Sequence, residues 1–141
     1  MKIQDILKSK GTQVHSIAPS ASLADVVHKL VQCNCGSLMV MNGDHVQGII
    51  TERDILRACA DDDRELSQIV VTERMTSKLI SCGSHDEVNA SMGMMTHHRI
   101  RHLPVIDDGH LVGIISIGDV VKAQHDSLTL ENQFLKDYIQ S

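Results

Sequence analysis

Aromatic side chains are almost absent from this sequence. Its 141 residues contain no tryptophan, one phenylalanine (Phe134) and one tyrosine (Tyr138), both close to the C-terminus. The core must therefore be built from aliphatic side chains and methionine. The shortage also argues against nucleic acid as a partner, because proteins that bind single strands stack the bases on aromatic rings. The net charge of −5 points the same way, since a phosphate backbone requires a basic surface.

Long apolar runs are absent as well. No stretch approaches the roughly 18 apolar residues of a membrane span. The N-terminal MKIQDILKSKG also lacks the apolar run of a secretion signal. We therefore expect a cytoplasmic protein without a membrane partner. Its four cysteines should stay reduced there.

An internal repeat organises what is present. Residues 37–58 align without a gap on residues 102–123, and eight of the 22 positions are identical. The identical pairs include Gly48 with Gly113 and Asp54 with Asp119. This similarity predicts a first repeat at 1–65, a second repeat at 66–125 and a C-terminal helical tail at 126–141.

Both repeats show the same predicted order of elements. In the first, the apolar spacing from Ser22 to Asn34 indicates a helix, and Ser22 with Asp25 forms its capping box. Residues 38–41 and 46–50 are predicted to be strands, joined by the turn 42–44, in which Asn42-Gly43 supplies the positive φ angles. A second helix is expected at 51–60. The corresponding elements of the second repeat are expected at 87–98, 103–106, 111–115 and 117–125.

The fold class that follows is α+β. Short β-like segments at 14–17 and 79–82 precede the elements of each repeat, and the acidic stretch 61–65 is expected to be an exposed connector. A single repeat of about 65 residues would struggle to bury enough apolar surface alone. We therefore predict two tandem β-α-β-β-α repeats packed sheet to sheet with pseudo-twofold symmetry.

A Gly-Ile-Ile-Thr/Ser-x-x-Asp pattern marks a predicted strand-to-helix junction in both repeats, at 48–54 and 113–119. Thr or Ser followed three residues later by Asp is also a common structural capping box. Its recurrence favours a binding role, because the free N–H groups and the dipole of a helix start attract anionic ligands. An ionised Asp only accepts hydrogen bonds, which suits the two hydroxyls of a ribose.

These residues resemble the two motifs of a cystathionine-β-synthase (CBS) domain pair, also called a Bateman module. The resemblance rests on GIITERD at 48–54 and RHLPVIDDGHLVGIISIGD at 101–119, and it covers about residues 1–125. The first repeat departs from the pattern at 35–40, where the proline and the basic residues of the second are missing. The architecture is similar to that of small stand-alone bacterial CBS-pair proteins that hold AMP or NAD.

The resemblance implies two clefts for adenine nucleotides between the repeats. In CBS pairs the Asp holds the ribose, the Ser or Thr approaches the sugar or phosphate, and the β-like segment of the opposite repeat lines the adenine. Carried over to this sequence, one cleft comprises Thr51, Asp54, Leu79, Ile80, Arg101 and His102. The other comprises Ser116, Asp119, Val14, His15, Gly36 and Ser37. Only the first cleft then receives cationic groups, since Gly36 and Ser37 offer neutral donors. The Thr51/Asp54 cleft is therefore expected to bind phosphorylated ligands more tightly than the other cleft.

The predicted function is regulatory rather than enzymatic. The module is expected to bind AMP, ATP or NAD, with ADP and S-adenosylmethionine also open, and to signal to a protein target that the sequence does not name. An alternative is an interaction module whose clefts have lost their ligand. A homodimer is expected through the second helix of each repeat, which offers Ile55, Leu56, Val120 and Val121, and through the tail, which carries Leu128, Leu135, Tyr138 and Ile139.

Histidine and cysteine are the remaining candidates for chemistry. Cys33-x-Cys35 lacks the two-residue spacer of common zinc sites, and His97 and His98 point to different faces of their helix. A Cys–His nucleophile pair stays open, although nothing in the sequence orients one. Motifs for a nucleophilic serine or a phosphate-binding loop are missing. We expect no metal site and no catalytic cofactor.

Overall fold

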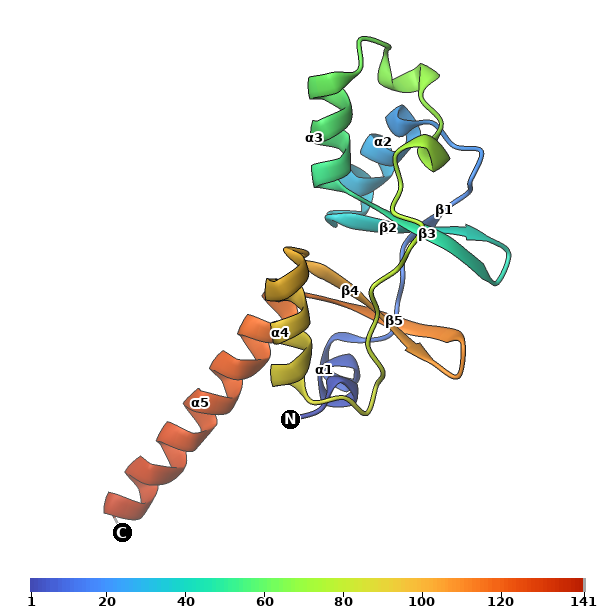
Figure 1. The fold of residues 1–141 in the computed structure, drawn as a ribbon. Helices are drawn as coiled ribbons and strands as arrows, with labels where there is room; N and C mark the ends of the chain where they lie inside the picture. The colour runs from blue at the N-terminus through green and yellow to red at the C-terminus, as the bar shows by residue number, and fades with distance from the viewer. Residues whose placement is uncertain (141) are drawn as a thin grey trace. The chain divides into compact units, whose positions relative to one another are not determined.

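The computed structural model describes residues 1–140, which form two compact units (Figure 1). The middle unit is Gln13–Ile80. The terminal unit combines Met1–Thr12 with the chain from Ser81 onward. Both contain helices and a small sheet, so the predicted α+β class is confirmed. The repeat boundaries at 65 and 125 stay a prediction, because these units are defined by packing and not by sequence similarity.

The middle unit is built on a three-stranded sheet in the order β1-β2-β3. Strand β1 (Ser16–Ile17) runs parallel to β2 (Ser37–Asn42), and β2 pairs antiparallel with β3 (His45–Thr51). Two α-helices accompany the sheet, α2 (Leu23–Cys33) and α3 (Glu52–Asp61). Two short 3₁₀-helices follow, η1 (Leu66–Gln68) and η2 (Val71–Glu73).

The start and end of α2 follow from its sequence. The Asp25 backbone N–H donates to Ser22 Oγ at 3.1 Å, and the Ser22 N–H donates to Asp25 Oδ2 at 2.9 Å. This reciprocal pair confirms the predicted capping box. The helix ends at Asn34, which adopts the left-handed conformation with φ 50°. Between these ends, Leu23, Val26 and Leu30 are buried on one face.

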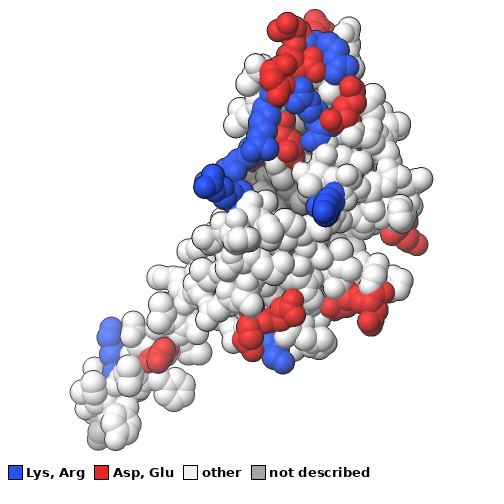
Figure 2. Space-filling view, viewed as in Figure 1, with Lys and Arg blue, Asp and Glu red and all other residues white. Residues whose placement is uncertain are grey.

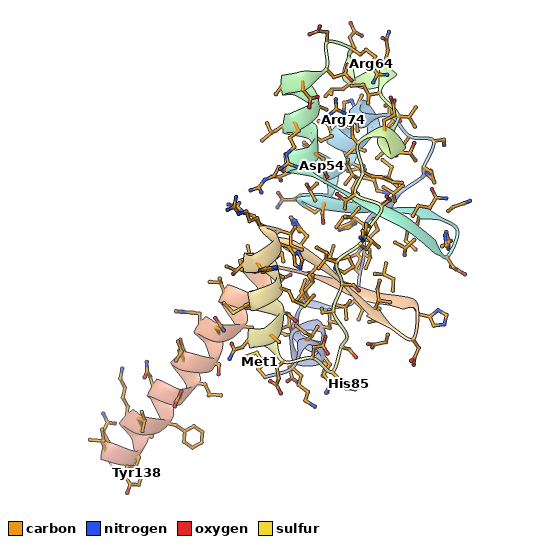
Figure 3. The ribbon with its side chains drawn as sticks, viewed as in Figure 1. Met1, Asp54, Arg64, Arg74, His85 and Tyr138 are labelled. Atoms are coloured by element: carbon orange, nitrogen blue, oxygen red, sulfur yellow. The ribbon has the colours of Figure 1, made fainter. Side chains whose placement is uncertain are left out.

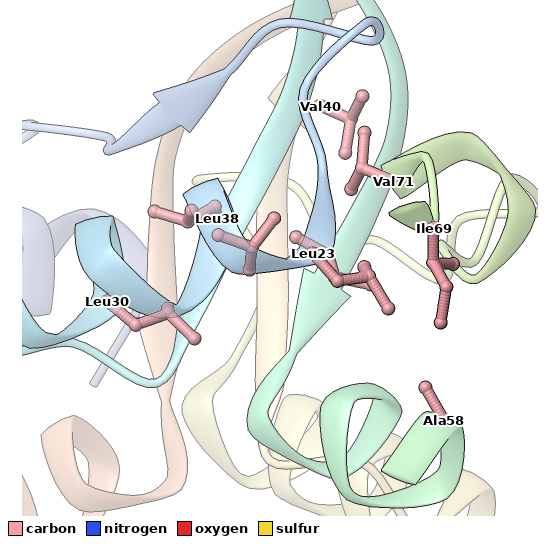
Figure 4. Packing of buried hydrophobic residues seen from close by; sticks show 9 residues of the cluster. Leu23, Leu30, Leu38, Val40, Ala58, Ile69 and Val71 are labelled. Carbon is pink, nitrogen blue, oxygen red and sulfur yellow. The ribbon is translucent and has the colours of Figure 1, made fainter. Parts of the chain in front are cut away.

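The core of the middle unit also contains residues from the segment after α3 (Figure 4). Ile69 and Val71 are fully buried in it. Backbone hydrogen bonds hold this segment against the start of α2, from the Leu23 N–H to the Ile69 carbonyl (2.9 Å) and from the Val71 N–H to the Ala21 carbonyl (2.8 Å). The buried members of the cluster are Leu23, Val26, Leu30, Leu38, Val40, Ile50, Ala58, Ile69 and Val71.

Arginine side chains hold the acidic connector at one end of the middle unit. Asp62 forms ion pairs with Arg64 (2.8 Å) and Arg74 (3.4 Å), and Arg64 also reaches Glu73 (3.1 Å). Hydrogen bonds from the side chain and backbone of Arg64 hold the pKa of Asp62 well below its usual value. Figure 2 shows acidic and basic side chains gathered at this end of the unit, and Figure 3 labels Arg64 and Arg74. The predicted exposed connector is therefore exposed in part only, since the Asp62 side chain is mostly covered.

The terminal unit has a two-stranded sheet of β4 (His102–Asp107) and β5 (His110–Ser116). Helix α1 (Ile3–Lys10) packs against β5 and α5 (Ile117–Gln140), and α4 (Val88–His98) packs against β4 and α5. The C-terminal part of α5 extends past α1 and α4 (Figure 1). The large buried apolar side chains of this unit are Ile3, Ile6, Leu7, Val88, Met95, Leu103, Val105, Ile115 and Val120.

Several local predictions need correction. The helix predicted at 117–125 and the tail form one continuous helix, α5, and Val120, which was expected on the dimer surface, is buried. Helix α1 and the two 3₁₀-helices were not predicted, because each is short: α1 buries three apolar residues, η2 buries Val71 and η1 buries none. The predicted strand at 79–82 is reduced to a single bridge between Cys82 and Val105. In the first hairpin Asn42 belongs to β2, and Gly43 (φ 60°) alone has a positive φ. The second hairpin has positive φ at two loop residues, Asp108 (49°) and Gly109 (77°).

Candidate functional site

The first candidate site lies where β3 ends and α3 begins. The Thr51 backbone N–H donates to Asp54 Oδ2 at 2.9 Å, and the Thr51 hydroxyl donates to the same oxygen at 3.1 Å (Figure 3 labels Asp54). Both residues are half-buried. Because the helix start uses Oδ2 twice, Oδ1 of Asp54 is not required for capping and can accept a hydrogen bond from a ligand.

Six further residues predicted for the two clefts lie in the same unit as Thr51. Ser37 pairs with Thr51 across β2 and β3, and the Gly36 carbonyl accepts from the Glu52 N–H at 3.1 Å. The His15 carbonyl accepts from the Met39 N–H at 3.0 Å, which places Val14 and His15 at the entry to β1. The remaining two are half-buried at the end of the unit, Leu79 and Ile80.

The second candidate site has the same design in the terminal unit. The Ser116 N–H donates to Asp119 Oδ2 at 2.8 Å, and the Asp119 N–H donates to Ser116 Oγ at 3.2 Å. His102 pairs with Ser116 across β4 and β5, and the Arg101 carbonyl accepts from the Ile117 N–H at 2.9 Å. The structure therefore brings Arg101 and His102 beside Ser116, and Gly36 and Ser37 beside Thr51. Their predicted assignment to clefts of the opposite repeat stays a prediction.

Lys10, which no sequence motif predicted as part of a site, forms an ion pair with Asp119. Lys10 Nζ is 2.6 Å from Asp119 Oδ2 and also donates to the Ile114 carbonyl at 2.8 Å. Burial of Asp119 raises its pKa, but the hydrogen bonds from Lys10 and from Ser116 outweigh burial, so the pKa is lowered. The carboxylate is therefore ionised at neutral pH. Sequence patterns do not reveal this pair, because 109 positions separate the two residues.

Cysteine, histidine and acidic side chains were the other candidates for chemistry. Burial raises the pKa of Cys82 to about 11 and also raises the pKa of Cys35, so both thiols are in the unreactive protonated form at neutral pH. Within residues 1–140, no group of three or more His, Cys, Asp and Glu side chains is placed to hold a metal ion. The rings of His97 and His98 instead meet edge to face, 4.9 Å apart. None of the described helices is long and apolar enough to cross a membrane.

Comparisons with known proteins match both repeats to one family. The CBS domain family model matches residues 3–61 and again residues 66–126. The "CBS domain-containing protein CBSX3, mitochondrial" of Arabidopsis thaliana is 38% identical over an alignment of 147 residues, gaps included, that covers 98% of this chain and 71% of that protein. The crystal structure of the CBS-domain containing protein ATU1752 from Agrobacterium tumefaciens has a TM-score of 0.85 at 36% identity, covering 88% of this chain and 99% of that one.

A further solved structure contains ligands. It is the CBS domain pair of protein MJ0100 in complex with 5′-methylthioadenosine and S-adenosyl-L-methionine. Its TM-score is 0.77 at 25% identity, and the match covers 90% of this chain and 98% of that one. Both of its ligands contain an adenosine group with a ribose diol.

Proposed function

The chain belongs to the CBS domain family, and from this membership we propose that it is a regulatory module that binds an adenine nucleotide such as AMP, ATP or NAD. Binding is proposed to change the contacts of the module with a protein target. No catalytic step is part of this proposal. Absorbance and mass spectrometry of the supernatant after denaturing the purified protein would identify a nucleotide that it retains.

The observation that carries the proposal is the pair of matching carboxylates. Asp54 and Asp119 each follow a strand by three residues, and each uses Oδ2 to cap its helix. The second oxygen of each carboxylate can accept from a ribose hydroxyl, and the free N–H groups of the helix start favour a phosphate. The adenosine ligands of MJ0100 support the same class of ligand for this chain.

Replacing both carboxylates should weaken nucleotide binding. In the double variant Asp54→Asn and Asp119→Asn, each site loses a charged acceptor, so AMP affinity should fall by about 1.5–3 kcal/mol per site. Isothermal titration calorimetry with AMP measures this loss. Asp44→Asn is the matched control, because Asp44 is an exposed aspartate in the first hairpin turn. An unchanged AMP affinity in the double variant would contradict the ribose assignment.

We also propose that a second copy of the chain covers the C-terminal part of α5. Six large apolar side chains there are 56–80% exposed: Leu128, Leu130, Phe134, Leu135, Tyr138 and Ile139. Figure 2 shows mostly uncharged side chains on the visible face of this part of the helix, with basic and acidic side chains among them. Such a surface is rarely left in water, and two identical apolar stripes can cover each other without another partner.

A single charge on this stripe should dissociate the dimer. Leu135→Glu places a carboxylate within the proposed interface, and burying it without a partner should weaken dimerisation roughly a hundredfold or more. Thr129→Glu is the control, because a helix turns about 100° per residue and Thr129 lies on the polar side. Light scattering over a range of protein concentrations compares the variants. A wild-type monomer, or a Leu135→Glu variant as dimeric as the wild type, would contradict the proposed interface.

A further inference from the structure

The ammonium group of Lys10 is fixed at the second candidate site. Lys10 is the last residue of α1, and its Nζ bonds both the Ile114 carbonyl (2.8 Å) and Asp119 Oδ2 (2.6 Å). The Lys10 side chain is 31% exposed and the Asp119 side chain 24% exposed. The pair is therefore accessible to a ligand, although much of it is shielded from solvent.

The first candidate site has a lysine at the corresponding position, but within the described chain that lysine does not form an ion pair with the carboxylate of its site. Leu7 lies against Gly113, where an added Cβ would be 2.8 Å from Leu7 Cδ2. Met75 lies against Gly48 in the same way, where an added Cβ would be 2.8 Å from Met75 Sδ. Lys10 follows Leu7 by three residues.

Lys78 follows Met75 by the same three residues, so it is the positional counterpart of Lys10. The Lys78 side chain is exposed, and among the described residues it forms no ion pair. The hydrogen bonds to Asp54 come from Thr51. The two sites thus share the same type of capping box, but of these two carboxylates only Asp119 has a lysine ammonium group from residues 1–140 bound to it.

This difference changes the electrostatic interaction of each carboxylate with a charged ligand. An isolated carboxylate repels a phosphate, and at partly shielded positions the repulsion acts over several ångströms. Lys10 compensates the charge of Asp119. An ammonium group carries three N–H donors, and the contacts to Ile114 and Asp119 occupy two of them. The third can donate to a phosphate oxygen.

We propose that Lys10 makes the Asp119 site selective for phosphorylated adenosine ligands, by compensating Asp119 and by offering its remaining donor to phosphate. This role rests on the proposed function, because it assumes that Asp119 holds the ribose. Lys10 acts here as a specificity-determining residue. An uncharged adenosine would bind Asp119 with or without it.

The test compares AMP with adenosine in the Asp54→Asn background, in which the Asp119 site remains intact. Lys10→Met should weaken AMP binding about tenfold or more, because it removes a nearby positive charge, and should change adenosine binding less than about threefold. Lys10→Arg keeps the cation and should retain most of the AMP affinity. Lys78→Met is the matched control and should leave both affinities unchanged. Calorimetry measures the AMP and adenosine affinities of each protein, and circular dichroism checks the fold of each variant.

The outcomes separate the two proposals. If Lys10→Met weakens AMP binding and adenosine binding equally, or weakens neither, Lys10 does not discriminate between phosphorylated and unphosphorylated ligands. The proposed nucleotide binding would not be contradicted by that result. If neither compound binds the Asp54→Asn protein, the proposed function of the Asp119 site fails together with the role of Lys10. If the Lys10→Met variant does not fold, the salt dependence of ligand binding to the Asp54→Asn protein tests the proposal instead. AMP binding should weaken with added salt and adenosine binding should not, whereas equal salt dependence overturns the proposal.

Discussion

Replacing Ile69 with alanine is expected to lower the free energy of unfolding by about 2–5 kcal/mol, the usual cost of truncating a buried isoleucine. Ile69 is fully buried and packs into the core of the middle unit beneath α2 (Figure 4). Its backbone carbonyl already accepts from the Leu23 N–H, so the segment cannot easily move to close the cavity. Urea unfolding followed by circular dichroism, at one fixed protein concentration, measures the change.

The adjacent residue supplies the control. The Val70 side chain is 39% exposed, so Val70→Ala should cost less than about 1 kcal/mol. Both variants lie in the same segment and remove only aliphatic carbon. Equal losses of stability would mean that the cost comes from the segment's backbone and not from filling the core.

Replacing Gly48 with alanine should be nearly as damaging. A Cβ at this position would lie 2.7 Å from the Thr76 carbonyl oxygen, a backbone atom that cannot rotate away. That oxygen accepts from the Ile49 N–H at 3.0 Å, and the Thr76 N–H donates back to the Ile49 carbonyl at 2.9 Å. We expect a loss of about 2–4 kcal/mol, because overpacking and the weakened bridge both contribute.

Gly113→Ala is the natural comparison, because Gly113 occupies the same position in the second repeat. Its added Cβ would meet Leu7 Cδ2 at 2.8 Å, the far end of a flexible side chain. Rotation of Leu7 should limit the loss to about 1 kcal/mol. Urea unfolding of the two variants side by side measures the difference. A Gly113→Ala variant that is less stable than Gly48→Ala would contradict this account.

Local sequence patterns predicted the regular elements well. The helix after Ser22, both hairpins and the helices after Thr51 and Glu87 lie within one or two residues of the predicted bounds. Capping boxes and hydrophobic periodicity are properties of neighbouring residues, so a single sequence contains them in full. The two candidate carboxylates were found in the same way, because each is part of its own capping box.

The same reasoning could not place short segments that depend on distant partners. Helix α1 has only Ile3, Ile6 and Leu7 to bury, and its packing partners begin beyond residue 80. Ile69, Val70 and Val71 form a short apolar run between polar residues, and only the assembled core shows that Ile69 and Val71 pack with α2.

The sequence by itself therefore determined the repeat, the family resemblance and the two strand-to-helix junctions, all of which depend on residues close together in the chain. Only the tertiary structure decided which segments complete each unit, and only it brought Lys10 to Asp119. That ion pair joins α1 to the start of α5, and the local pattern around Lys10 does not distinguish it from the other lysines. Contacts across more than a hundred positions form through packing, and hydrophobic spacing along the chain does not record them.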